Sequence, residues 1–305
     1  MARRKRGRDL HGILLFDKPA GCSSNQALQR VRRLFNANKA GHTGSLDPLA
    51  TGMLPVCFGE ATKLSGFLLD ANKGYETTLQ LGVCTDSADA DGDVTEVRPV
   101  PAHLDQAAFS AVCHAFLGDQ QQVPPMVSAI KVNGQRLYKL AREGRTIERA
   151  PRAVHFFNID VLSFNGDTAT LAVVCSKGTY IRSLVTDIGE RIGCGAHVTA
   201  LRRTHVAPFV EQSMWAESVL SDREDRDQLI LPLDAGLEHM PKATLNDDAC
   251  HAFRHGQSVH PAQLSAEPEH AGEIYRVYDA QHRMAGLGSV AIDGQLAPKR
   301  VLQLG

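Results

Sequence analysis

The sequence "GHTGSLDPLATG", residues 41–52, places one acidic side chain, Asp47, in a loop that is rich in glycine. Gly44 and Gly52 permit tight turns in which a side chain would clash. Pro48 fixes its own backbone and biases Asp47 toward an extended conformation, so the carboxylate has a defined direction. A carboxylate with a defined direction suggests catalysis. Taken alone, however, an Asp-Pro pair in a glycine-rich loop is more often a turn residue that bonds its own backbone.

The whole chain has an ordinary composition and almost no net charge. Its 305 residues are enough for about two domains, and a net charge of −1 neither demands nor excludes a polyanionic partner. The opening "MARRKRGR" carries five basic side chains. A tail this basic is usually disordered and often contacts nucleic acid, so we interpret residues 1–10 as a basic N-terminal arm.

The sequence lacks the motifs that mark several other functional classes. The seven cysteines are scattered, with no CxxC pair and no Cys/His spacing suited to zinc, which favours a reduced, cytoplasmic protein without a metal site. No apolar run is long enough to span a membrane, and "GILLF" (12–16) is followed at once by Asp17 and Lys18, unlike a signal-peptide core. Walker, Rossmann, HExxH and GxSxG motifs are missing, so a nucleotide-driven or nicotinamide-driven reaction is not expected.

Hydrophobic periodicity predicts the main elements. A buried strand leads from Gly12 into a turn at Lys18, and Ser23 and Gln26 form the capping box of a helix. Further along we predict a half-buried strand with Tyr75, Thr77, Leu79 and Leu81 on one face, a helix over 104–117, and a strand that turns at Gly178 into a helix with Ile181, Leu184, Val185, Ile188 and Ile192 on one face. We interpret "TDSADADGDV" (85–94) as an acidic surface loop, because Val94 stands where a calcium loop needs glycine.

These elements do not repeat as βαβ units, which favours an α+β fold with a mixed sheet over a doubly wound one. We assign residues 11–212 to a larger first domain. Within it, residues from about 122 to 152 form a basic excursion that carries Lys131, Arg136, Lys139, Arg142 and Arg145. A charged connecting segment follows over 213–244, and short strand-like runs then predict a small, mainly β domain over 245–305.

The loop around Asp47 resembles the signature of the bacterial tRNA pseudouridine synthases of the TruB type. Further motifs match that family in order and with similar spacing: Lys18-Pro19, Lys73-Gly74-Tyr75, "QVPPMVSAIK", "CSKGTYIRSL" and "GAHVTALRRT". The resemblance covers about residues 11–210, and the C-terminal part is similar to a PUA-type RNA-binding domain. Ser45 stands where many relatives have Thr and keeps the hydroxyl. Val127 stands where many have Tyr, so this chain lacks an aromatic ring for stacking at that position.

The resemblance implies an activity and a catalytic set. The family isomerises the uridine at position 55 in the T-arm loop of tRNA to pseudouridine, an intramolecular reaction that needs no cofactor. By resemblance, Asp47 is the nucleophile, Arg182 pairs with it, and Tyr75 stacks on the uracil near C5. An Asp carboxylate has an ordinary pKa of roughly 3.9 and is ionised at neutral pH. Attack at C6, attack at C1′ and a route through a glycal all stay open.

The resemblance also implies how tRNA is bound, by a monomer that needs no protein partner. The target uridine is flipped out of its loop, with His42 inserted in its place, and Tyr180 and Leu201 wall the pocket. Lys131 and Arg142 of the basic excursion hold phosphates, and Lys18 is placed with the substrate-binding residues.

Two other classes of function are compatible with the residues. One is an RNA-binding protein without catalysis, in which Tyr75 and Tyr180 pack and Arg182 forms an ordinary ion pair. That reading does not explain why Asp47, Tyr75 and Arg182 occur together. The other is a hydrolase for a small molecule with Asp47 as its nucleophile. The basic arm, the basic excursion and the PUA-like end weigh against a small substrate.

Overall fold

The computed structural model describes residues 7–128, 131–132, 135–137, 140, 143–145, 147–210, 212–265 and 271–304. Its centre is an eight-stranded sheet in the order β1-β3-β12-β4-β11-β10-β7, with β2 paired to the side of β3. The strands are β1 Gly12–Lys18, β2 Ala40–His42, β3 Thr51–Phe58, β4 Lys73–Leu81, β7 Gly118–Gln122, β10 Arg152–Phe164, β11 Thr168–Cys175 and β12 Ala196–Val206. All neighbours are antiparallel except β12 and β3, so the sheet is mixed, as predicted.

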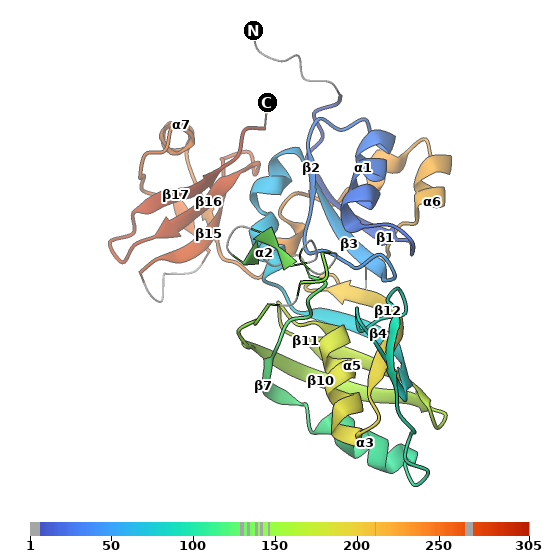
Figure 1. Cartoon of the computed structure of the whole chain (residues 1–305). Helices are drawn as coiled ribbons and strands as arrows, with labels where there is room; N and C mark the ends of the chain where they lie inside the picture. The colour runs from blue at the N-terminus through green and yellow to red at the C-terminus, as the bar shows by residue number, and fades with distance from the viewer. Residues whose placement is uncertain are drawn as a thin grey trace.

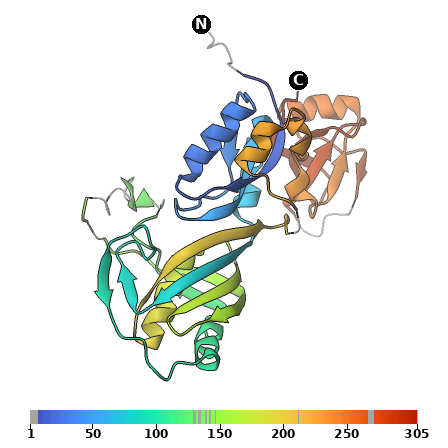
Figure 2. The ribbon, with the colours of Figure 1, turned by 90° about the vertical axis from the view of Figure 1, so that its right-hand side faces the viewer.

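Helices pack against the two halves of this sheet, and each half forms a lobe with its helices (Figures 1 and 2). They are α1 Ser24–Leu34, α2 Ser65–Leu69, α3 Gln106–His114, α5 Ile181–Ile192 and α6 Glu217–Asp222, with 3₁₀ turns η1 Gly59–Lys63, η2 Arg226–Leu229 and η3 Ala235–Leu237. α1 and α6 lie with β1 and β3 in one lobe. α3 and α5 lie against β4, β10 and β11 in the other, while β4 and β12 connect the lobes.

Each lobe has its own apolar core, and local sequence explains the elements that build it. The predicted capping box of α1 is confirmed, with Ser23 accepting from the Gln26 backbone and Gln26 accepting from the Ser23 backbone. In β4, alternation buries Tyr75 and Leu79 and exposes Glu76, as predicted for a half-buried strand. The apolar face of α5 packs with these β4 side chains in one cluster of the second lobe. The junction between the two cores is therefore built by β4, β12 and the start of α5.

The C-terminal part is a separate five-stranded sheet in the order β14-β13-β15-β16-β17. Its strands are β13 Lys242–Thr244, β14 Gln263–Leu264, β15 Glu273–Tyr278, β16 Met284–Val290 and β17 Leu296–Val301, and one helix, α7 Asp247–Arg254, packs Phe253 against them. This agrees with the small, mainly β domain that the sequence predicts. The sheet already includes Lys242, within the segment that we assigned to the connection.

Specific contacts dock this domain on the first one. The Lys63 ammonium on η1 donates to the carbonyl of Val301 at 2.9 Å, and the Gln303 backbone donates to Glu60 at 2.8 Å. Leu64 and Leu302 share an apolar cluster across the same boundary. The domain therefore has a fixed place beside α2, which Figure 1 shows.

Two short hairpins leave the main sheet. One pairs β5 Val83–Thr85 with β6 Val94–Val97, and the other pairs β8 Lys131–Val132 with β9 Gln135–Arg136 within the basic excursion. In the part of the chain that the structure describes, no helix has the length and apolar character needed to cross a bilayer.

Candidate active site

The Asp47 loop joins β2 to β3 at the boundary of the two lobes, and its ends require glycine. Gly44 and Gly52 have φ angles of +85° and +99°, in the left-handed region that residues with a Cβ rarely adopt. A Cβ on Gly52 would lie 2.2 Å from the carbonyl oxygen of Arg203 on β12. The glycines thus permit the close approach of β3 and β12 that brings Asp47 to the strand ends.

Polar contacts from β1 and α1 hold the Asp47 loop in place. The Lys18 ammonium, which has no exposed surface, donates to the carbonyls of Ala50 at 2.6 Å and Pro19 at 2.9 Å. The Ser24 hydroxyl at the start of α1 donates to the Leu46 carbonyl and accepts from the Leu46 backbone N–H. Lys18, expected among the substrate-binding residues, therefore lies behind the loop, and we propose that it positions Asp47 instead of contacting substrate.

Arg182, the second residue of α5, meets Asp47 as expected, with Nε 2.9 Å from Oδ2. The guanidinium is 2% exposed. The guanidinium does not bind Asp47 through two parallel hydrogen bonds, and its Nε–H is not aligned with the carboxylate. The other two nitrogens face different partners: Nη1 lies 3.3 Å from Asp89 and donates to the Ser87 carbonyl at 2.8 Å, and Nη2 donates to the Val127 carbonyl at 2.7 Å.

Asp89 is a site residue that sequence reasoning missed. Its place in an acidic stretch suggested a surface loop, but its side chain is buried beside Arg182. The hairpin that carries it folds back on β12, where the Ala90 backbone donates to the Val198 carbonyl at 2.8 Å. Burial of this one carboxylate among several exposed ones depends on that long-range contact, which leaves no local signal in the sequence.

The environment of Asp47 raises its pKa above the ordinary value of 3.8. Burial is the largest cause, because it disfavours the charged form, and the nearby Asp89 carboxylate adds to it. The cations of Arg182 and Lys18 oppose the rise. Asp47 is thus a poorly hydrated carboxylate held beside a fixed cation, with 35% of its side chain still open to an incoming molecule. A carboxylate in such a setting is suited to act as a nucleophile.

Asp47 and Arg182 open into a cavity of about 290 Å³. The predicted wall residues all line it. Tyr75 on β4 and Leu201 on β12 form part of the sheet surface beneath it, and Tyr180 stands at its edge as the residue before α5. The Gln122 side chain fixes the Tyr180 backbone through hydrogen bonds of 2.8 and 3.0 Å. The other lining residues are Gly44, Ser45, Leu46, Leu69, Lys73, Ser128, Gly178, Thr179, Ile181 and Arg203.

Other predicted residues lie elsewhere. His42 is half-buried at the end of β2 and does not line the cavity. Burial and the Arg203 charge lower its pKa, so the ring is neutral at pH 7, and its Nδ1 has no hydrogen-bond partner among the described residues. Lys131 is described only as backbone in β8, and Arg142 lies outside the described residues.

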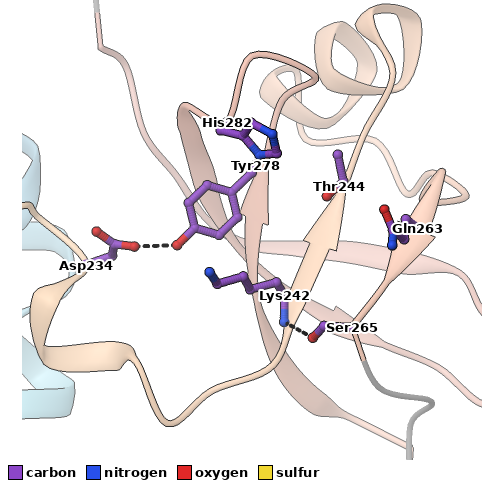
Figure 3. Close-up of a pocket in the computed structure, with 7 residues that line it drawn as sticks. All are labelled: Asp234, Lys242, Thr244, Gln263, Ser265, Tyr278 and His282. Atoms are coloured by element: carbon purple, nitrogen blue, oxygen red, sulfur yellow. Dashed lines mark hydrogen bonds between the residues drawn. The ribbon is translucent and has the colours of Figure 1, made fainter.

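A larger cavity, of about 580 Å³, lies between the connecting segment and the C-terminal sheet (Figure 3). Its acid, Asp234, accepts a hydrogen bond from the Tyr278 hydroxyl, and the Lys242 ammonium lies 5.7 Å from the Tyr278 ring centre. The Asp234 carboxylate is thus already engaged with its own chain. The smaller cavity, with its partly open carboxylate and buried arginine, is the candidate active site.

Comparison with known proteins shows the family of the whole chain. Residues 32–181 match the TruB family pseudouridylate synthase (N terminal domain), residues 182–238 the tRNA pseudouridylate synthase B C-terminal domain, and residues 241–302 the Pseudouridine synthase II TruB, C-terminal. The chain is 50% identical to the tRNA pseudouridine synthase B of Stutzerimonas stutzeri (strain A1501), over 97% of each protein. It is 48% identical to that of Chromohalobacter salexigens, over 99% of this chain and 97% of that protein.

Solved structures show the same fold. A chain in "Crystal Structure of a Cbf5-Nop10-Gar1 Complex" superposes with a TM-score of 0.73 at 28% identity, over 96% of this chain and 84% of that one. The described geometry, the three family models and the near full-length relatives lead to one conclusion. The chain belongs to the TruB family of pseudouridylate synthases.

Proposed function

We propose that the chain converts uridine in tRNA to pseudouridine, with the uridine at position 55 of the T-arm loop as its target. The observation that carries the proposal is the Asp47 carboxylate, 2.9 Å from the buried Arg182 and open to a cavity of about 290 Å³ beside Tyr75. The curated relatives, named tRNA pseudouridine synthase B, support tRNA as the substrate.

The reaction rearranges one nucleoside and consumes nothing. The bond between ribose C1′ and uracil N1 breaks, a bond between C1′ and C5 forms, and the proton lost from C5 is balanced by one gained at N1. Asp47 supplies the electron pair that starts it, by attack at C6 or C1′ or as the base of a glycal route. Each route uses the ionised carboxylate.

Arg182 and the cavity walls supply orientation and shelter. Arg182 faces Asp47 from a rigid helix start, so it fixes the direction of the carboxylate, and a small misplacement of a nucleophile can cost about 100-fold in rate. Tyr75 offers its ring to the uracil. Tyr180 and Leu201 keep water from the base while it is detached from the sugar.

Binding requires that the uridine leave its stacked loop, at a cost of about a few kcal/mol. We infer that His42, neutral and next to the Asp47 loop, inserts among the loop bases, and that Lys131 and Arg142 hold phosphates. We also propose that the chain acts on tRNA as a monomer, in the cytoplasm.

The test is incubation of the purified protein with an unmodified tRNA transcript, without metal or nucleotide, followed by chemical mapping of pseudouridine. We expect one pseudouridine, at position 55, and none when that base is replaced by cytidine. Asp47→Asn is the matched control, because it preserves shape and removes the charge. Tight binding of tRNA without pseudouridine would favour the non-catalytic alternative, and modification at another base would refute the proposed target.

A further inference from the structure

Two buried cations besides Arg182 line the active-site cavity. Lys73 is 7% exposed and Arg203 is 1% exposed, and both line the cavity. Lys73 and Tyr75 are two residues apart on β4 and therefore point to the same face. Arg203 lies opposite Tyr75 in the pairing of β12 with β4. The ring of Tyr75 is therefore flanked by both cations.

Both side chains are held by backbone carbonyls. The Lys73 ammonium donates to the carbonyls of Leu69, at 3.0 Å, and Ala71. Because an ammonium has three N–H groups, one remains without a partner among the described residues. Arg203 donates to the carbonyl of Met53 at 2.6 Å and to that of Gly44 at 3.2 Å.

The free space of the cavity adjoins these cations. A Cβ built on Gly44 would lie 3.7 Å from Nη1 of Arg203 and 3.9 Å from Cε of Lys73. Gly44 also lines the cavity, in the loop that carries Asp47. Gly44 therefore lies between the cavity and the side chains of Arg203 and Lys73.

Tyr75 lies near both the Asp47 carboxylate and the Arg203 guanidinium, which line the same cavity. The groups that shift the pKa of Asp47 are Arg182, Asp89 and Lys18. Burial and the Arg203 charge lower the pKa of Lys73 to about 8, with smaller effects from Cys175 on β11, Asp70 after α2 and Lys177 after β11. The pKa of Tyr75 responds to both Arg203 and Asp47. A base stacked on Tyr75 would thus reach from the carboxylate toward the ammonium.

The proposed reaction moves negative charge in that direction. Attack of a carboxylate at C6 pushes the ring electrons onto C5 and O4, and cleavage of the C1′–N1 bond leaves its electron pair on N1, shared with O2 and O4. In both cases a carbonyl oxygen of the uracil becomes negative until the new bond forms. A buried cation placed there in advance stabilises such charge without reorganisation.

We propose that Lys73, with Arg203 beside it, binds the carbonyl oxygen on which the uracil carries negative charge during the isomerisation. Lys73 is then a further catalytic residue, and Arg203 is a positioning residue for Lys73 and Tyr75. This inference rests on the proposed function. The alternative is that Lys73 only ties down the turn at 69–71, in which case its charge would matter for stability and not for rate.

The experiment compares single-turnover rates of pseudouridine formation for the wild type, Lys73→Met and Lys73→Arg, at saturating enzyme and between pH 6 and 10. Lys177→Met is the matched control, since this exposed lysine, paired with Asp70 at 3.1 Å, lies near Lys73 but does not line the cavity. We expect Lys73→Met to lose about 100-fold or more in rate, as when one donor to a developing oxyanion is removed. Its thermal midpoint should fall, because methionine cannot donate to the carbonyls of Leu69 and Ala71, so rates are compared well below that midpoint. Its RNA affinity should stay close to that of the wild type.

The pH profile distinguishes a catalytic role of the Lys73 charge from a purely structural role of its side chain. The protonated ammonium is the active form, so the wild-type rate should fall as pH rises through about 8. Lys73→Arg should retain part of the rate and shift this fall to higher pH, because arginine stays charged. The role of Lys73 would be overturned if the wild type is active and Lys73→Met reacts as fast as Lys177→Met. It would also be overturned if the alkaline limb of the pH profile stays in place in Lys73→Arg. An inactive wild type would refute the proposed function instead.

Discussion

Replacing Arg182 by lysine retains the positive charge and removes the planar fork. In the native protein three nitrogens serve four partners, on Asp47, Asp89, Ser87 and Val127, at 2.7–3.3 Å. A lysine ammonium is one point and cannot lie within hydrogen-bond distance of acceptors on three separate loops. We therefore expect Asp47 to lose its fixed direction while the local charge is unchanged.

The magnitude follows from the partners that the guanidinium no longer serves. Misorientation of the nucleophile should cost about 100-fold in single-turnover rate. Each part-buried carbonyl left unpaired, on Ser87 or Val127, should cost at most about 1–3 kcal/mol of unfolding free energy. Arg182→Ala should be worse on both counts, because it leaves the buried Asp89 without its cation, a loss of about 3–5 kcal/mol for a buried pair.

The assay is the single-turnover rate of pseudouridine formation at saturating enzyme, together with a thermal melt. Arg202→Lys is the matched control, since Arg202 is the next residue to Leu201 on β12 but pairs with Asp17, and is 42% exposed. We expect the control to react at nearly the wild-type rate. If Arg182→Lys also reacts at the wild-type rate, net charge suffices and the orientation argument is wrong.

Asp89→Asn should lower the pKa of Asp47, because the Asp89 charge raises it. The acid limb of the pH–rate profile should therefore move to lower pH. An unmoved limb would show that the Asp89 charge does not act on Asp47. The raised pKa of Asp47 means that the folded state binds its proton more tightly than the unfolded chain, so its ionisation costs stability as pH rises above 3.8. Asp47→Asn should therefore melt no lower than the wild type at pH 7, with any advantage lost near pH 3.5, and a clear loss of stability at pH 7 would contradict this sign. Deletion of residues 1–6 should weaken tRNA binding and leave single-turnover chemistry intact. The dependence of the binding constant on salt should become shallower, by about 0.7–0.9 in log–log slope for every phosphate that the arm no longer neutralises. Normal binding with failed chemistry would refute this.

Local pattern was enough to predict the elements that build the site. The capping box at Ser23 and the alternation around Tyr75 concern neighbours along the chain, and both were confirmed. The same alternation placed Lys73 on the face of Tyr75, a signal that could have identified it as a cavity residue. Sequence reasoning passed over it because a lysine is normally exposed.

The burial of charge could not be predicted in the same way. Lys18 and Asp89 are charged side chains in ordinary local contexts, and their burial depends on carbonyls and cations brought from distant segments. The contacts of the Arg182 guanidinium with three separate loops also depend on segments that are distant in the sequence. Position on a strand or helix can be inferred from spacing, whereas the partner of a buried charge depends on which loops the fold brings together.

The central claim is that the Asp47 carboxylate starts the isomerisation. Its most direct test is the single-turnover rate of pseudouridine formation by Asp47→Asn on a T-arm stem-loop, measured beside the binding affinity of the same variant for that RNA. We predict a fall in rate of several orders of magnitude with affinity nearly unchanged, because the variant keeps the shape of the site and loses only the nucleophile. A rate close to that of the wild type would contradict the account.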